Sequence, residues 1–244
     1  VTVGGAPADK AARLVAPGEA VVVPPPPSRF VSRGGEKLAA ALDAFSLPVT
    51  GADALDAGAS TGGFTDCLLQ RGAAAVTAVD VGRGQLDHRL RTDPRVSVVE
   101  GANVRFLDLA ALRRPGRPFT LVVADLSFIS LGVVAPALVG LAAPGADMVV
   151  LVKPQVEAGR GEAARGQGVI RDPAVWRRVL DAVDGAFEAA GAVMMGLVVS
   201  PLLGARGNVE FLAHLACRPP VLSARPEIDV EAAVAGGLAL LEGR

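Results

Sequence analysis

The fold class is decided by the stretch Leu55-Asp56-Ala57-Gly58-Ala59-Ser60-Thr61-Gly62-Gly63-Phe64. This stretch joins a short apolar segment, residues 54–56, to a segment of helical character that runs through Leu68 and Leu69. A glycine-rich turn between a strand and a helix is typical of open parallel sheets, in which ligands bind beyond the carboxyl ends of the strands. The stretch therefore predicts a cofactor site within an α/β domain.

The chain on both sides continues the alternation of strands and helices. The apolar pattern predicts strands at residues 75–80, 96–100, 121–125, 148–153, 193–199 and 209–215, and helices at residues 131–141, 173–190 and 227–242. Strands that alternate with helices favour a mostly parallel sheet covered on both faces. Glycines and arginines in residues 156–172 predict a mobile basic loop.

Three parts of unequal size are expected. Residues 1–23 contain short valine-rich segments around a Gly4-Gly5 turn, which is typical of a small β remnant. Four consecutive prolines then make residues 24–29 a stiff linker. Residues 30–244 form the main domain.

Composition excludes several classes of protein. Of the 244 residues, 51% are hydrophobic and 20% charged, which excludes wholesale disorder, and the net charge of −1 excludes a histone-like polycation. Two cysteines cannot make a disulfide framework, so we expect a reducing compartment, the cytoplasm. Two histidines make a histidine-rich metal site unexpected, and we predict no metal.

One apolar segment, residues 130–152, is long enough to suggest a membrane span. It is interrupted by Pro136, Pro144, Gly145 and Asp147. We therefore expect a helix followed by a buried strand, and no stable membrane insertion.

The acids beside the glycine-rich stretch indicate which cofactor it binds. The spacing is not the G-x-G-x-x-G of dinucleotide sites, and Asp56 would repel a pyrophosphate while suiting an ammonium group. The next strand ends in Asp80, where an acid commonly bonds ribose hydroxyls. A ribose and an amine without phosphate describe S-adenosylmethionine better than NAD. The alternative is a turn that is glycine-rich for structural reasons alone.

Lysine is rare in this chain, since only three lysines stand beside 21 arginines. Lys153 ends a predicted strand, as Asp125 ends the preceding one, so both should point into one crevice. Lysine can act as a base after burial, whereas arginine stays charged. Lys37, in a predicted helix, and Glu210, on a late strand, complete a group of four candidate site residues with Asp125 and Lys153.

Each member of this group has an ordinary structural alternative. Lys153 could be a strand-end lysine that reaches solvent, and Asp125 a helix N-cap, although Ser127 or Ser130 would cap better. Lys37 and Glu210 could be surface residues. Four such residues around one crevice favour a site. Arginine-rich stretches at residues 83–95, 105–117 and 160–178 flank the same edge and raise the expectation of a polyanionic substrate.

Six blocks of sequence resemble the TlyA haemolysin-like family of ribosomal RNA methyltransferases, which is similar to FtsJ-type 2′-O-methyltransferases. They run in order over most of the chain and are Phe30–Leu38, Leu55–Cys67, Ala78–Leu86, Asp125–Leu131, Leu151–Gln155 and Gly207–Phe211. The resemblance implies a class I, Rossmann-like methyltransferase fold with seven strands. It also implies transfer of a methyl group from S-adenosylmethionine to a ribose 2′-hydroxyl of ribosomal RNA, with cytidine as the expected nucleotide.

The resemblance also assigns site residues. A catalytic Lys-Asp-Lys-Glu tetrad falls on Lys37, Asp125, Lys153 and Glu210. Cofactor contacts fall on Asp56, Gly58, Ala59, Ser60, Thr61, Gly62, Gly63 and Phe64, with Asp80 at the ribose and Asn103 near the adenine. Family members carry an N-terminal RNA-binding domain of the ribosomal-protein type, and residues 1–23 look like its last strands. Arg83 and His88 stand where the family often has aromatic residues.

Three functions remain open from sequence. The first is a ribosomal RNA 2′-O-methyltransferase, in which Lys153 takes the hydroxyl proton or stabilises the alkoxide, Asp125 and Glu210 orient the lysines, and Lys37 holds the ribose. The second is a non-catalytic RNA-binding or ribosome-assembly module on the same fold. The third is a membrane-active haemolysin, for which an uninterrupted apolar span or a strongly basic amphipathic helix would be expected.

Overall fold

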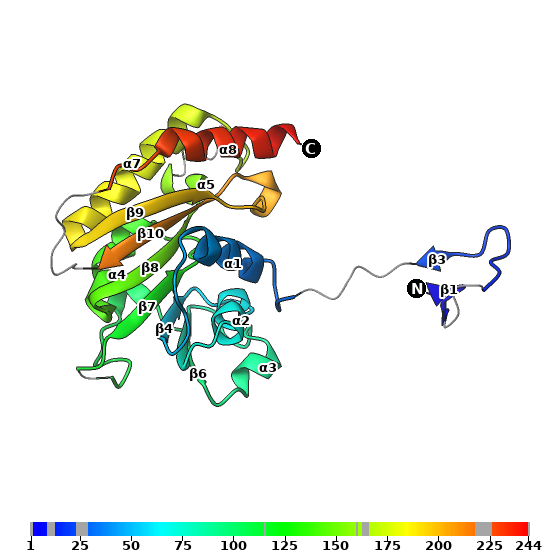
Figure 1. Cartoon of the computed structure of the whole chain (residues 1–244), viewed down its shortest axis with the longest axis horizontal. Coiled ribbons are helices and arrows are strands. Elements are labelled where there is room, and N and C mark those ends of the chain that lie inside the picture. Colours follow the sequence, from blue (N-terminus) through cyan, green and yellow to red (C-terminus); the bar gives the residue numbers. More distant parts are fainter. Residues whose placement is uncertain are drawn as a thin grey trace.

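A computed structural model describes residues 2–8, 13–22, 29–114, 116–159, 161–162, 166–217 and 226–243. The proline run, Lys10, and Arg160 and Arg165 of the predicted basic loop lie outside the described residues. The described residues form a three-stranded sheet near the N-terminus and a seven-stranded sheet in the main domain (Figure 1).

The seven-stranded sheet confirms the predicted fold class. In chain order its strands are β4 (Asp53–Ala57), β5 (Ala75–Asp80), β6 (Val96–Glu100), β7 (Phe119–Ala124), β8 (Ala142–Val152), β9 (Ala192–Val199) and β10 (Phe211–Cys217). In space the order is β6-β5-β4-β7-β8-β10-β9, and only β10 runs antiparallel to its neighbours. After β4 the chain adds β5 and β6 on one side of it and then β7 on the other side. Open α/β sheets bind ligands at such a point, which here lies between β4 and β7.

Helices cover both faces of this sheet (Figure 1). The described helices are α1 (Gly34–Ala44), α2 (Gly63–Gln70), α3 (His88–Arg91), α4 (Leu131–Leu141), α5 (Pro154–Glu157), α7 (Pro173–Ala190) and α8 (Val230–Glu242). The first three contribute to one hydrophobic core, through Leu38, Leu68 and Leu90, and α4, α7 and α8 contribute to the other.

The central strands are apolar on both sides because each side chain enters one of these two cores. In β7, Val122 joins the core under α4 and α7, while Val123 joins the core under α1 and α2. In β8, Val150 joins the core under α4 and α7, and Leu151 joins the core under α1 and α2. Neither face reaches solvent, which explains the continuous apolar runs that predicted these strands.

Several predicted strand limits were wrong by one to six residues, including those of β8 and β10. β8 begins at Ala142, directly after α4, because the segment around Pro144 and Gly145 still pairs irregularly with the start of β7. β10 begins at Phe211, so Glu210 precedes the strand. The apolar segment 130–152 is a helix followed by a buried strand, as predicted, and no helix among the residues described is long and apolar enough to cross a membrane.

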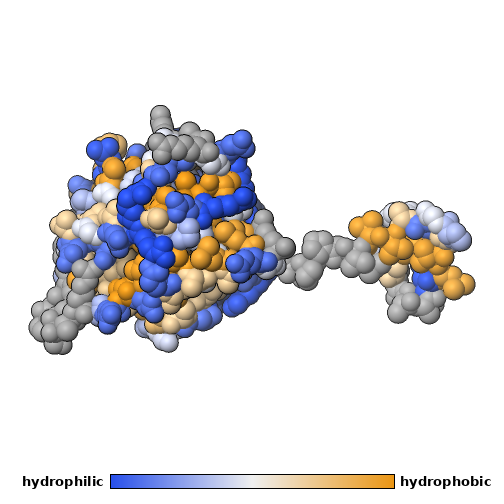
Figure 2. All heavy atoms as spheres, turned by 90° about the horizontal axis from the view of Figure 1, so that it is seen from above, coloured by the Kyte–Doolittle hydropathy of each residue, from blue (hydrophilic) through white to orange (hydrophobic). Residues whose placement is uncertain are grey.

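The small sheet consists of β1 (Thr2–Val3), β2 (Ala6–Pro7) and β3 (Val21–Val22), in the order β2-β1-β3. Its pairs are antiparallel, and β1 turns into β2 at Gly4-Gly5, as expected. Val21 and Val22 are 50% and 56% exposed. Figure 2 shows hydrophobic residues gathered over this sheet.

Candidate active site

Two adjoining cavities lie at the carboxyl ends of the parallel strands. The larger holds about 470 Å³ and the smaller about 220 Å³. Gly58, Ser60 and Asp125 line both cavities. The larger one extends past the ends of β5 and β7, while the smaller one extends to the start of α1 and α2. The arrangement provides room for one elongated ligand beside a second group.

The glycine-rich stretch separates the two cavities and needs its glycines. Gly58 has φ +89°, and a Cβ there would lie 2.3 Å from the carbonyl oxygen of Asp125. Gly62 has φ +99°, and a Cβ there would lie 2.2 Å from Leu90 Cδ1. Both positions therefore exclude a side chain on steric grounds and through their left-handed backbone. The tight turn presses the loop against the end of β7.

Most residues predicted to contact the cofactor lie on a cavity wall. Asp80 and Asn103 line the larger cavity, and Ala59, Thr61, Gly63 and Phe64 line the smaller one. Asp80 accepts hydrogen bonds from the backbone N–H of Ser60 (2.8 Å) and of Gly82 (2.6 Å). This carboxylate therefore joins the loop after β4 to the loop after β5. Gly62 shapes the turn but lines neither cavity.

Asp56 is placed differently from the expectation that its carboxylate faces the cofactor. It is fully buried at the end of β4 and lines neither cavity. Thr65 Oγ1 donates to Asp56 Oδ2 at 2.6 Å, whereas Oδ1 has no hydrogen-bond partner among the described residues. Burial, reinforced by the nearby Asp125, raises the pKa of Asp56 to about 7. The carboxyl group thus lies beneath the loop and is partly protonated near neutral pH.

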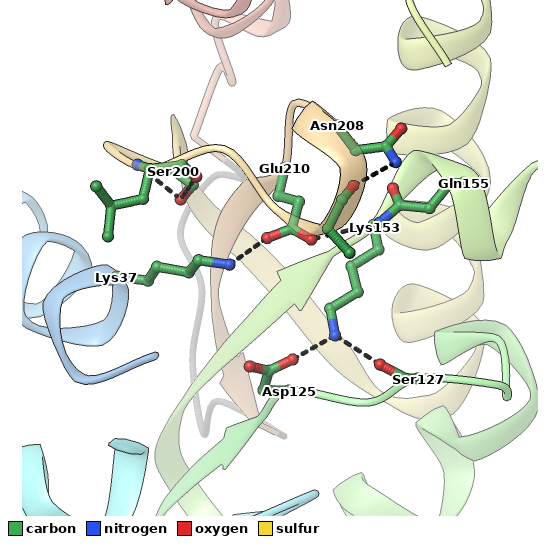
Figure 3. Close-up of polar contacts among 10 residues, drawn as sticks. Lys37, Asp125, Ser127, Lys153, Gln155, Ser200, Asn208 and Glu210 are labelled. Atoms are coloured by element: carbon green, nitrogen blue, oxygen red, sulfur yellow. Dashed lines mark hydrogen bonds and ion pairs between the residues drawn. The ribbon is translucent and has the colours of Figure 1, made fainter. Parts of the chain in front are cut away.

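The four residues of the predicted tetrad form two ion pairs (Figure 3). Lys153 Nζ lies 2.5 Å from Asp125 Oδ1, and Lys37 Nζ lies 2.5 Å from Glu210 Oε2. Lys37 comes from α1, Asp125 and Lys153 from the ends of β7 and β8, and Glu210 from the segment before β10. Residues as far apart in sequence as 37 and 210 are therefore brought to one edge of the sheet.

Burial shows that Lys37 and Glu210 are not the ordinary surface residues that the sequence also allowed. Lys37 is 7% exposed and Glu210 is 2% exposed. Charged groups are almost never buried unless they are paired, and removal of one partner leaves a costly unpaired charge. Lys37 is therefore not an exposed helix residue, and Glu210 is not a surface strand residue. Asp125 is also not the N-cap of α4, because Ser130 caps that helix through the N–H of Gly132.

Three further residues at the site were not singled out from sequence. Lys153 Nζ donates to Ser127 Oγ at 2.9 Å, and Gln155 Nε2 donates to Glu210 Oε1 at 3.3 Å (Figure 3). Phe128 lines the larger cavity, is fully exposed and has φ +72°. A bulky residue with a left-handed backbone and a fully exposed ring is unusual, and such strain is concentrated at functional sites. Only their proximity to Asp125 and Lys153 in sequence could have drawn attention to them.

Many arginines of the arginine-rich stretches are paired with acids, and two of these pairs lie at the opposite edge of the sheet, because Arg95 directly precedes β6 and Asp53 begins β4. Ion pairs join Arg91 with Glu100, Arg114 with Asp53, Arg95 with Asp93 and Arg89 with Asp87. The basic surface is therefore smaller than the arginine-rich stretches suggested. Arg33 is exposed and lines the smaller cavity. Among the described residues, no group of three or more histidines, cysteines or acids could hold a metal ion.

Comparison with known proteins agrees with this geometry. Residues 30–217 match the FtsJ-like methyltransferase family. The chain is 50% identical over 216 residues to the 16S/23S rRNA (cytidine-2′-O)-methyltransferase TlyA of Mycobacterium tuberculosis, which covers 88% of this chain and 79% of the relative.

Solved structures extend the comparison. A protein of Streptococcus thermophilus, described as a proposed hemolysin, is 38% identical, with a TM-score of 0.81 over 93% of this chain and 80% of its own. An S-adenosylmethionine dependent methyltransferase from Mesorhizobium loti, 16% identical over 72% of this chain and 96% of its own, shares the fold alone with a TM-score of 0.54. Since the family match spans most of the chain and the M. tuberculosis relative is matched over most of its length, this chain belongs to the FtsJ-like methyltransferase family, among the TlyA proteins.

Proposed function

We propose that this protein transfers a methyl group from S-adenosylmethionine to a ribose 2′-hydroxyl of ribosomal RNA, with cytidine as the nucleotide. The observation that carries the proposal is the Lys153–Asp125 ion pair, in which Asp125 lines both cavities. It holds the Lys153 amine next to Asp125, beside the place where a cofactor and a second ligand would meet. The name of the M. tuberculosis relative supports the choice of substrate. A ribosomal RNA substrate also implies a cytoplasmic location.

The larger cavity has the chemistry that S-adenosylmethionine requires. Asp80 supplies a carboxylate for ribose hydroxyls, and Asn103 lies on the same wall. Val81, Val104 and Ile129 add an apolar lining suited to an adenine ring. The residues present therefore fit the cofactor.

The tetrad performs the proton chemistry of the proposed reaction. A ribose hydroxyl is a poor nucleophile, and Lys153 is placed to take its proton or to stabilise the alkoxide that forms. When bound, S-adenosylmethionine would supply the methyl group on a positively charged sulfur, and Asp80 and Asn103 of the larger cavity would hold it beside the ribose. Asp125 holds the Lys153 ammonium. Lys37, fixed by Glu210, lies at the smaller cavity and holds the ribose.

The proposal is tested by mapping methyl groups on ribosomal RNA. Ribosomal RNA without this modification is incubated with the full-length chain and S-adenosylmethionine, and the sites are then read by resistance of the 2′-O-methylated linkage to alkaline cleavage. We expect resistance at a discrete cytidine. Methylation found on a base, or no incorporation while the cofactor binds, would contradict the proposal.

We also propose that the N-terminal sheet is part of an RNA-binding domain. Its support is the order of short antiparallel strands and the exposed apolar residues Leu14, Val21 and Val22. Such a domain would orient the RNA so that the target ribose reaches the smaller cavity.

The Asp80→Asn variant is expected to bind S-adenosylmethionine about tenfold more weakly, which corresponds to roughly 1.4 kcal/mol. Asparagine has a single acceptor oxygen, so the side chain cannot accept from Ser60 and Gly82 on separate oxygens as Asp80 does. Titration calorimetry measures the change. Asp147→Asn, at the opposite end of the sheet, is the matched control and should leave the affinity unchanged. Equal affinity for both variants would remove Asp80 from the cofactor site.

The Phe128→Ala variant is expected to lower kcat/KM for RNA by about 10- to 100-fold, the value of one base stacked on an aromatic ring. The exposed ring at the cavity mouth is placed to stack on the target base or its neighbour. Phe128→Trp should retain activity, because it keeps an aromatic ring at this position. Phe106→Ala is the control, because Phe106 is 73% exposed but lines no cavity at this site. An equal loss in both alanine variants would show a general surface effect.

A further inference from the structure

The amine of Lys153 has two partners of different chemistry. Asp125 Oδ1 lies 2.5 Å from Nζ, and Ser127 Oγ accepts from Nζ at 2.9 Å (Figure 3). Both partners belong to the segment between β7 and α4, and both line the larger cavity. The Lys153 side chain itself is only 12% exposed. The amine is therefore held from one side by consecutive parts of the same loop.

Counting donors and acceptors shows what the second partner adds. The lysine nitrogen has three positions beside its bond to Cε, and one of them must face the substrate hydroxyl. One partner occupies one position, but the amine still rotates about the Cε–Nζ bond. The ion pair with Asp125 and the hydrogen bond to Ser127 occupy two positions, so the direction of the third is determined. An ionised carboxylate only accepts, whereas a hydroxyl both accepts and donates, so Ser127 can hold the amine in either protonation state.

The ordinary role for a serine at this position is already filled. A serine just before a helix usually caps its N-terminus. In this loop Ser130 caps α4 by accepting from the N–H of Gly132 and also donates to Glu157. The hydroxyl of Ser127 takes no part in that cap, and its hydrogen bond to Lys153 needs another explanation.

We propose that Ser127 is a positioning residue that, together with Asp125, directs the amine of Lys153 toward the substrate hydroxyl. The inference deepens the proposed 2′-O-methyl transfer and rests on it for the identity of that hydroxyl. Ser127 takes no proton from the substrate and acts through Lys153.

The rarity of lysine allows a direct test of the positioning. With only three lysines in the chain, lysine labelled with carbon-13 at Cε gives three NMR signals, and that of Lys153 is the one missing from Lys153→Arg. In the full-length chain we expect restricted motion of the Lys153 Cε group, seen as two distinct Hε shifts. The Ser127→Ala variant should merge these shifts, and Ser127→Thr should restore them. An unchanged Lys153 signal in Ser127→Ala would overturn the proposal.

Kinetics supply the second measurement. Ser127→Ala should lower kcat for RNA methylation about tenfold, the value of one hydrogen bond, with KM for RNA and affinity for the cofactor unchanged. Ser127→Thr should recover kcat. Ser130→Ala is the matched control, because it loosens the same loop without removing a partner of Lys153. An equal loss of kcat in Ser130→Ala, or no rescue by threonine, would contradict the inference.

The two measurements separate this inference from the proposed function. If the wild-type chain methylates no ribose while Ser127→Ala frees the Lys153 amine, the positioning by Ser127 stands and the reaction is wrong. If ribose methylation is found and the amine is unaffected by Ser127→Ala, the reaction stands and the positioning is wrong.

Discussion

The Lys153→Ala variant is expected to lose methyl transfer to RNA by about 100- to 10,000-fold, the usual contribution of a positioned general base. The physical reason is that the 2′-hydroxyl keeps its proton when no amine lies beside Asp125. Incorporation of tritiated methyl groups into ribosomal RNA measures the loss. Binding of S-adenosylmethionine should be retained, because Lys153 lines neither cavity wall directly.

The Lys153→Arg variant separates proton transfer from electrostatics. Arginine keeps a positive charge opposite Asp125 but does not release its proton, so it cannot serve as a base. We expect Lys153→Arg to be nearly as inactive as Lys153→Ala. A fully active arginine variant would exclude the base and leave only an electrostatic role. Full activity of the alanine variant would remove Lys153 from the reaction altogether.

The Asp56→Asn variant is expected to change how stability depends on pH. The pKa of Asp56 is raised from 3.8 to about 7 in the folded protein, foremost by burial. Between these values the folded state binds a proton that the unfolded state does not, so this group stabilises the fold at low pH and loses that contribution as pH rises through about 7. From pH 5 to pH 8 the loss is about 3 kcal/mol, from roughly two pKa units. Asparagine cannot titrate, so the Asp56→Asn variant does not lose this contribution to stability as pH rises.

Thermal unfolding of the cofactor-free protein checks this prediction. The Tm of the wild type minus the Tm of Asp56→Asn should be lower at pH 8 than at pH 5 by roughly 5–10 °C. The comparison across pH matters, because the buried amide of asparagine changes stability by an amount that does not depend on pH. Asp181→Asn, at an exposed position of α7, serves as the control. Parallel Tm curves for wild type and Asp56→Asn would show that Asp56 is ionised throughout this range.

The sequence predicted much of the site because the residues that carry it end apolar strands. Asp80 and Lys153 each follow a run of buried residues, and parallel strands bring their carboxyl ends to one edge. The acids and the glycine-rich loop therefore predicted a cofactor site before any packing was known. Glu210 was assigned to a strand because alternating residues suggested one, whereas pairing with β8 and β9 begins only at Phe211.

The partners within the site could not be read from the chain. Lys37 and Glu210 are 173 residues apart, and their pairing depends on where α1 packs against the sheet edge. The position of Asp56 beneath the loop likewise follows from the path of the glycine-rich turn. Local patterns record which residues are apolar or charged, but not which distant residue compensates a buried charge.

By itself, the sequence determined the α/β class and the order of most elements, because these depend on periodicity and on residues close together in the chain, and it predicted the cofactor loop and the four residues of the tetrad. The tertiary structure alone decided that Lys153 pairs with Asp125 and Lys37 with Glu210, that Ser127 holds the Lys153 amine and that the Phe128 ring stands free at the cavity. These contacts join segments that are distant in the chain. Strand order and the paths of the loops bring the segments together, and the packing of the two hydrophobic cores fixes the strand order and the loop paths.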